Sequence, residues 1–168
     1  RVRLTANANA TDDTSVKITI QDTRTFGQGG DSTGLYTDGA NSITSNHLDL
    51  HEAYVNVANI FGAPIALRAG RQELNYGDQR LVGGFGWSNN GRAFDGFKAM
   101  YTNDAVDVDL FTTTISEDGV SINDDTSFSG VYATIKQLVP NNTVVLYLLN
   151  KNDNADYKLY TIGARLAG

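Results

Sequence analysis

The sequence contains no cysteine, only two prolines and no long run of apolar residues. A chain without cysteine has neither a disulfide scaffold nor a thiolate metal site, and it can cross an oxidising periplasm without cross-linking. Because no stretch approaches the roughly 18 consecutive apolar residues of a spanning helix, helical membrane proteins are excluded. A β-barrel is not excluded, since barrel strands alternate apolar and polar residues and are mildly polar on average. The mean hydropathy here is −0.29.

Positive charge is also scarce. The formal net charge is −6, whereas a surface that binds nucleic acid needs an excess of lysine and arginine, so we expect no nucleic acid among the partners. We also expect no signal peptide in the sequence, because Arg1 stands directly at the start of an alternating pattern, which predicts a processed or trimmed chain. The 168 residues fit a single domain, 1–168, and nothing in the composition divides them.

What the sequence does contain is alternation with a period of two. In residues 1–10 every even position is apolar and every odd position is polar, and the pattern resumes at 15–21. This period is typical of a β-strand with two different faces. Similar runs follow at residues 47–59, 64–74, 92–102, 105–115, 127–138, 143–151 and 157–167. The sequence thus predicts an all-β protein of about nine antiparallel strands, each near the roughly 9–11 residues that a tilted strand needs to cross a bilayer.

The predicted connections alternate between short and long. Those at 11–14, 61–64, 103–105 and 139–142 are short, and those at 27–46, 77–91, 116–126 and 152–156 are long or polar. In outer-membrane barrels the periplasmic turns are short and the extracellular loops are long. This rhythm favours an up-and-down transmembrane β-barrel over a soluble antiparallel sheet, which would show the same alternation within each strand.

The two faces of the predicted strands differ in charge. Several strands have an apolar face that we expect to meet lipid, namely Val16/Ile18/Ile20, Ala53/Val55/Val57, Val106/Val108/Leu110, Val131/Ala133/Ile135 and Tyr160/Ile162/Ala164. The opposite faces carry the charged residues Arg3, Lys17, Glu52, Arg68, Lys98, Asp107, Asp109, Lys136 and Arg165. A lone Arg or Lys on the lipid side would cost about 2–4 kcal/mol. We therefore expect the charged faces to line a water-filled interior, with Arg3, Lys17 and Lys98 among the lining residues.

Aromatic residues fall largely toward the predicted strand ends, where the interfacial girdles of a barrel lie. They are Tyr54, Phe61, Phe97, Tyr101, Phe111, Tyr147, Tyr157 and Tyr160. Ordinary strand propensity would enrich the same residues in any sheet.

No catalytic arrangement is apparent. The sequence has no Ser-His-Asp order, no G-x-S-x-G motif and no phosphate loop, so we expect neither an enzyme nor a cofactor. The two histidines, His47 and His51, stand four apart with Asp49 and Glu52 nearby. We expect a surface or rim position for them rather than a metal site.

The densest cluster of charge lies between Leu67 and Arg92. This strand–loop–strand segment contains several arginines, acids and asparagines, namely Arg68, Arg71, Arg80, Arg92, Glu73, Asp78, Asn75, Asn89 and Asn90. Arginines at a pore mouth or constriction attract anions and bind carboxylates in a bidentate manner. The same residues also suit a structural ion-pair network that stabilises an inward-folded loop. The two interpretations do not exclude each other.

The segment 47–101 resembles the core of the alginate-export porin family of Gram-negative outer membranes. The matching motifs are LHEAYV, LRAGRQELNYGDQRL and GWSNNGRAFDG. The resemblance implies a monomeric barrel of about eighteen strands, whose arginine-lined constriction passes an anionic uronic-acid polysaccharide. It also implies that Arg68, Arg71, Arg80 and Arg92 belong to the selectivity region, with Glu73, Asp78 and Asp95 as their partners.

We therefore expect a porin of the bacterial outer membrane through which an anionic solute, such as an acidic polysaccharide, diffuses or is exported. The alternative is a soluble or surface β-sheet module that binds carbohydrate on loops bearing Tyr and Asn. Nine strands are about half of the barrel that the resemblance implies, and an open sheet would leave unpaired edges in lipid. We therefore expect further sequence or another chain to supply the remaining strands, with outer-membrane lipid and lipopolysaccharide as surrounding partners.

Overall fold

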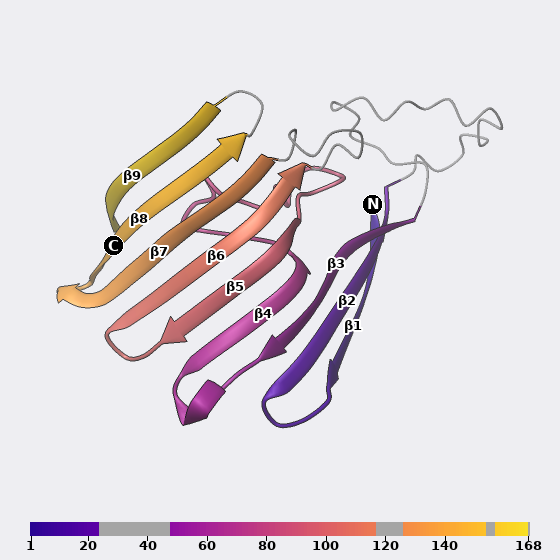
Figure 1. Cartoon of the computed structure of the whole chain (residues 1–168), viewed down its shortest axis with the longest axis horizontal. Helices are drawn as coiled ribbons and strands as arrows, with labels where there is room; N and C mark the ends of the chain where they lie inside the picture. The colour runs from indigo at the N-terminus through magenta and orange to yellow at the C-terminus, as the bar shows by residue number, and fades with distance from the viewer. Residues whose placement is uncertain (24–47, 117–125, 154–156, 168) are drawn as a thin grey trace.

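In the parts of the chain that the structure describes, nine β-strands form one antiparallel sheet in which each strand pairs with the next along the chain (Figure 1). The computed structural model describes residues 1–23, 48–116, 126–153 and 157–167. The strands are β1 (Val2–Asn9), β2 (Thr14–Asp22), β3 (Asp49–Val57), β4 (Ile65–Gln72), β5 (Phe94–Thr102), β6 (Val106–Ser116), β7 (Thr126–Val139), β8 (Asn142–Asp153) and β9 (Tyr157–Ala167). The only helical element among the described residues is a short 3-10 turn, η1 (Ile60–Gly62), so no helix there is long and apolar enough to cross a bilayer. The predicted all-β, up-and-down architecture is confirmed.

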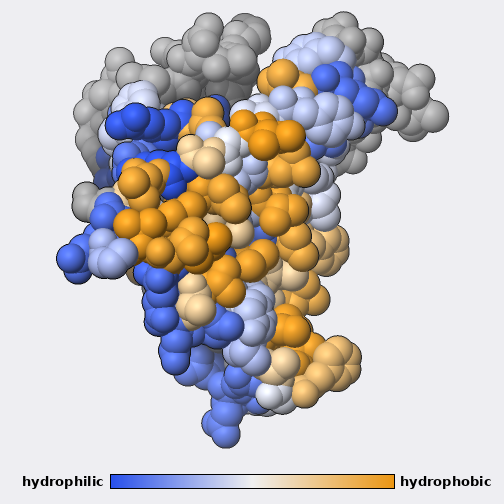
Figure 2. All heavy atoms as spheres, turned by 90° about the vertical axis from the view of Figure 1, so that its left-hand side faces the viewer, coloured by the Kyte–Doolittle hydropathy of each residue, from blue (hydrophilic) through white to orange (hydrophobic). Residues whose placement is uncertain are grey.

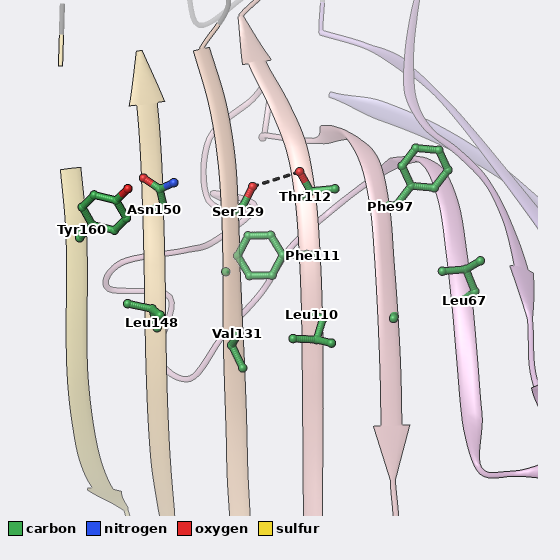
Figure 3. Close-up of a pocket in the computed structure, with 12 residues that line it drawn as sticks. Leu67, Phe97, Leu110, Phe111, Thr112, Ser129, Val131, Leu148, Asn150 and Tyr160 are labelled. Atoms are coloured by element: carbon green, nitrogen blue, oxygen red, sulfur yellow. Dashed lines mark hydrogen bonds between the residues drawn. The ribbon is translucent and has the colours of Figure 1, made fainter. Parts of the chain in front are cut away.

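The register of the sheet gathers the apolar residues on one side, which we call the outer face. Directly paired residues of antiparallel strands point to the same side. Val16 pairs with Val55, Leu110 with Val131, and Leu148 with Ile162. All five apolar stripes predicted from the sequence lie on this face, because the register links them strand by strand. Figure 3 shows side chains of this face on neighbouring strands, among them Leu67, Phe97, Leu110, Val131, Leu148 and Tyr160.

Hydrophobic side chains cover much of the outer face. In Figure 2, seen from the β9 side, they gather across the middle and along the right, which is the side turned to the reader in Figure 1. Hydrophilic side chains gather along the left and at the lower end. Ile162 is 81% exposed and Leu4 is 67% exposed. The hydrophobic core of the molecule is therefore not packed against the outer face.

The core lies on the opposite side, which we call the inner face, against the connection between β4 and β5. Residues 73–93, the inner loop from here on, run behind the sheet in Figure 1. Leu74, Tyr76 and Val82 of this loop are buried with Phe94, Phe111 and Leu149 of the strands. Phe128, Tyr132 and Tyr147 pack around them.

Two aromatic residues predicted for the interfacial girdle, Phe111 and Tyr147, belong to this core instead. Phe111 pairs with Gly130, and Tyr147 pairs with Tyr132 on β7 and Gly163 on β9. Both rings lie on the inner face and take part in the core rather than in a lipid-facing belt. The reason is parity, since Phe111 stands two residues from the charged Asp109 and therefore shares its face.

The short turns 10–13, 58–64, 103–105 and 140–141 join the strands at the lower edge of the sheet in Figure 1. The connections 23–48, 73–93, 117–125 and 154–156 join them at the opposite edge. The connection after β8, predicted as long or polar at residues 152–156, is shorter than expected, because β8 extends to Asp153 and only residues 154–156 separate it from β9. The two edges of the sheet are nevertheless distinct, and the inner loop begins at the edge that holds the longer connections.

Candidate functional site

Ion pairs between neighbouring strands cover the inner face. Nζ of Lys17 on β2 lies 2.6 Å from Oε2 of Glu52 on β3. Nζ of Lys98 on β5 lies 2.7 Å from Oδ2 of Asp109 on β6, and Nζ of Lys136 on β7 lies 2.7 Å from Oδ1 of Asp107 on β6. Each pair joins opposite charges across a strand boundary, which stabilises the register. Most positive charge on this face is therefore balanced locally.

The inner loop packs onto this face through aromatic contacts. The ring of Tyr76 stacks on Tyr132 at 4.4 Å and on Phe111 at 5.6 Å between centroids. The ammonium group of Lys98 lies 5.5 Å from the centroid of the same ring. Burial, with the nearby negative charge of Asp109, raises the pKa of the Tyr76 hydroxyl above its usual value. The loop is thus a packed layer on the sheet.

Polar contacts anchor one side of the loop to β1, β2 and β3. Oε1 of Glu73 lies 2.7 Å from Nε2 of His51 and accepts a 3.3 Å hydrogen bond from Nη1 of Arg3. Nδ2 of Asn75 donates to Oε2 of the same carboxylate at 3.1 Å. The amide of Gln21 donates to the carbonyl oxygen of Asn90 at 2.7 Å. The beginning and the end of the loop are therefore both held on the same three strands.

These contacts also set the charge state of Glu73. Burial raises the pKa of its carboxyl group, but the hydrogen bonds from His51 and Asn75 and the positive charge of Arg3 outweigh that effect. The pKa of Glu73 is consequently held below its usual value, so the carboxylate remains ionised at neutral pH.

At the other end of the strand order, an ion pair with β9 anchors the inner loop. Nη2 of Arg165 on β9 donates to Oδ2 of Asp78 at 2.7 Å. On the first side, Arg1 beside β1 donates from Nη1 to the carbonyl oxygen of Ser88 at 2.6 Å. Since β1 and β9 are the two ends of the strand order, the loop crosses the whole inner face from one end of the sheet to the other.

The arginines singled out in the sequence occupy different environments. Arg68 lies on the inner face, where Nε donates to Oδ1 of Asn56 at 3.4 Å and the guanidinium lies 4.3 Å from the centroid of Tyr54. Arg92 ends the inner loop with its guanidinium 4.3 Å from the centroid of Phe85. Within the described parts of the chain, neither of these two arginines has a carboxylate partner.

Arg71 and Asp95 lie on the outer face, so the expectation that they line the polar interior is corrected. They pair with each other in the register, and Nη1 of Arg71 lies 2.6 Å from Oδ2 of Asp95. Arg71 stands three residues after Arg68, and an odd spacing on a strand turns a side chain to the other face. Both residues lie near the strand ends that lead to the longer connections.

The expected partnerships of the acids hold only in part. Asp95 pairs with Arg71, and Asp78 approaches Arg80 at 3.7 Å. Asp78 lies closer to Arg165, however, and Glu73 binds Arg3 and His51 instead of any arginine of the cluster. The sequence did not indicate that His51, Arg165 and Arg1 hold the inner loop.

His51 is buried, which corrects its expected surface or rim position. The β2–β3 register shifts between Thr19 and Ile20, and His51 is the additional residue of this β-bulge. The bulge turns the imidazole toward the inner loop. His47 lies outside the described residues. Where the structure is described, no group of three or more His, Cys, Asp or Glu side chains is arranged to hold a metal ion.

A family model describes the same chain. The model named alginate export matches residues 1–168, the whole length. The chain belongs to the alginate export family. The resemblance expected from the motifs LHEAYV and GWSNNGRAFDG is thus confirmed. No curated protein matches the chain significantly.

Membership in the alginate export family assigns the chain to transport proteins rather than to an enzyme family. Together with the nine-stranded up-and-down sheet it supports, in general terms, an export channel of the outer membrane. The expectation of an outer-membrane porin with an up-and-down β-barrel fold agrees with this family and with the observed sheet.

Proposed function

We propose that the nine strands are part of the wall of a channel in the bacterial outer membrane, and that the channel passes an anionic solute, with an acidic polysaccharide as the main candidate. The observation that carries the proposal is the opposite chemistry of the two faces. The outer face exposes aliphatic side chains such as Ile162 and Leu4. The inner face carries the ion pairs Lys17–Glu52, Lys98–Asp109 and Lys136–Asp107. Such a wall suits lipid on one side and water on the other.

The distribution of charge on the outer face supports this placement. In the described strands, the charged residues of that face are Asp22, Arg71, Asp95 and Lys158, as their register partners indicate. All four lie at strand ends on one edge of the sheet, the edge at which the inner loop begins. Near Asp95, whose register partner on β6 is Thr114, the side chains of Thr112 and Ser129 form a 3.0 Å hydrogen bond (Figure 3). An apolar band bounded in this way matches the hydrocarbon layer, with lipid headgroups or lipopolysaccharide at the charged edge.

The open edges of the sheet support a larger ring. In the described residues β1 pairs only with β2, and β9 pairs only with β8. An unpaired strand edge in hydrocarbon leaves backbone N–H and C=O groups without partners, each at a cost of several kcal/mol. We infer that further strands, from the same gene product or from another chain, pair with β1 and β9.

Selection of anions would rest on a few unbalanced arginines rather than on the net charge of the wall. Most cations of the inner face have an acidic partner within 4 Å, whereas Arg68 and Arg92 are, with Lys151, among those that have none in the described residues. A guanidinium without a carboxylate partner keeps its N–H donors available for one. In a pore, such groups replace part of the hydration of the solute, while weak binding at several places allows the solute to leave.

The test measures ion selectivity of the assembled channel in planar bilayers. The double variant R68A/R92A should lower the preference for anions, which is obtained from the reversal potential in a KCl gradient. The matched control is R71A, which removes an arginine from the outer face, and it should leave the reversal potential unchanged. Unaltered selectivity in the double variant, or an equal effect of R71A, would refute the proposal.

A further inference from the structure

The turn at residues 85–88 and the neighbouring Arg92 present side chains that the packing of the inner loop does not use. Trp87 is 86% exposed, although tryptophan is the largest apolar side chain and usually finds cover. Leu74, Tyr76 and Val82 of the same loop are buried against the sheet. The exposed indole therefore lies on the free side of a loop whose other side is packed.

The backbone holds this turn in a fixed form. The N–H of Ser88 donates to the carbonyl oxygen of Phe85 at 2.8 Å, and the N–H of Arg92 donates to that of Gly84 at 2.7 Å. Arg1 donates from Nη2 to the carbonyl oxygen of Gly86 at 3.1 Å. Phe85 has a φ of +49°, in the left-handed region that a bulky residue rarely adopts. Such conformations persist where the surrounding contacts impose them, and they cluster at binding sites.

Three side chains of the turn form one surface. The rings of Phe85 and Trp87 meet edge to face at 64°, with centroids 5.7 Å apart. The guanidinium of Arg92 lies over the Phe85 ring at 4.3 Å. The edge-to-face contact leaves one face of the indole open to solvent, in agreement with the large exposed fraction of Trp87. The contact between Arg92 and the ring uses no N–H donor, so those donors stay available to a ligand.

We propose that Trp87, Phe85 and Arg92 form a subsite for one sugar ring that carries a carboxylate. A pyranose ring has an apolar face of C–H groups, whose positive edges suit the negative face of an aromatic ring. A carboxylate on that ring is the planar, bidentate partner of a guanidinium. Aromatic ring and arginine thus recognise the two parts of a uronate residue. This inference rests on the proposed channel function and adds to it a defined point of contact for the solute.

The same surface fits other ligands less well. A small inorganic anion would bind the guanidinium but gain nothing from the exposed indole. A lipid chain would meet this turn only if the turn left the inner face, yet Asn90 and Gly91 lie against Gln21, Arg3 and His51 of the first three strands. A sugar acid uses all three side chains.

The experiment records current blockades of the assembled channel by a defined alginate oligosaccharide, with a neutral maltooligosaccharide of equal length for comparison. W87A should shorten the residence time of the acidic oligosaccharide about tenfold, a factor that corresponds to about 1.4 kcal/mol. W87F should keep most of the residence time, because it retains an aromatic face. The matched control is L81A, which truncates another exposed apolar side chain of the loop and should have no effect. The chloride selectivity of W87A should equal that of the unmodified channel.

The outcomes separate this inference from the proposed function. An unmodified channel without anion preference would contradict the channel proposal itself. An anion-selective channel in which W87A leaves the oligosaccharide residence time unchanged would overturn the subsite alone. The subsite is also overturned if W87A changes the open-channel conductance and shortens the residence time of the neutral sugar as much as that of the acidic one. Trp87 would then contact a neighbouring strand instead of a ligand.

Discussion

The ring of Tyr147 on β8 covers the backbone of Gly163 on β9. The two residues are directly paired in the register, and a Cβ atom at position 163 would overlap the Tyr147 ring. Phe111 and Gly130 repeat the arrangement between β6 and β7. Aromatic rings that cover strand glycines exclude water from the backbone and pin the register. On the inner face Tyr76 of the inner loop stacks on Phe111 and on Tyr132, and Tyr132 stacks in turn on Tyr147.

We expect G163A to destabilise the protein by about 1–3 kcal/mol, because the added methyl group displaces a packed ring. G86A is the matched control, since a Cβ atom at position 86 meets nothing within 4 Å. The measurement is the urea midpoint of unfolding in detergent micelles. Equal midpoints for both variants would show that the Tyr147 ring moves aside without lowering the free energy of unfolding.

The charge of Glu73 makes the anchor of the inner loop sensitive to acid. Because its pKa in the folded protein is lowered, ionised Glu73 stabilises the fold fully above the unfolded pKa of about 4.3. This contribution is lost as the pH falls through the lower folded value. Relative to E73Q, the unmodified protein should therefore be more stable at pH 7, and the difference should vanish in strong acid. Far-ultraviolet circular dichroism reports the loss of the sheet on unfolding; a difference that does not depend on pH would contradict this role of Glu73.

Asp78 limits the positive charge that the inner face presents. It binds Arg165 at 2.7 Å and Arg80 at 3.7 Å. D78N should release both arginines and raise the anion preference of the channel, while stability changes by less than about 1 kcal/mol because the pairs are partly exposed. D95N makes the same chemical change on the outer face and should not alter the reversal potential. An unchanged anion preference in D78N would show that Arg165 and Arg80 do not face the solute.

The strands and their two faces could be predicted from the sequence because alternation is local information. Val16, Ile18 and Ile20 already indicate an apolar face, and the register of β2 with β1 and β3 confirms it. Parity alone could also have placed Arg71 opposite Arg68. The prediction failed there because the arginines were grouped by their density in the sequence and not by their face.

The inner loop could not be predicted in the same way. Its contacts join residues far apart in the chain, such as Arg3 with Glu73 and Arg165 with Asp78, and no periodic pattern encodes them. One signal was present, since Leu74 and Tyr76 continue the inner-face parity of Gln72 beyond the end of β4. The burial of His51 depends on a β-bulge, which the sequence of β3 does not reveal.

In the proposed channel the inner face meets water and the outer face meets lipid. Site-directed spin labelling tests it directly, because the sequence has no cysteine to remove. Labels at I162C and T161C occupy adjacent positions of β9 on opposite faces, since Ile162 pairs with Leu148 and Thr161 with Leu149. In liposomes, dissolved oxygen should accelerate the spin relaxation of the label at position 162. A water-soluble nickel chelate should accelerate the spin relaxation of the label at position 161. Equal access of the chelate to both labels would contradict the account.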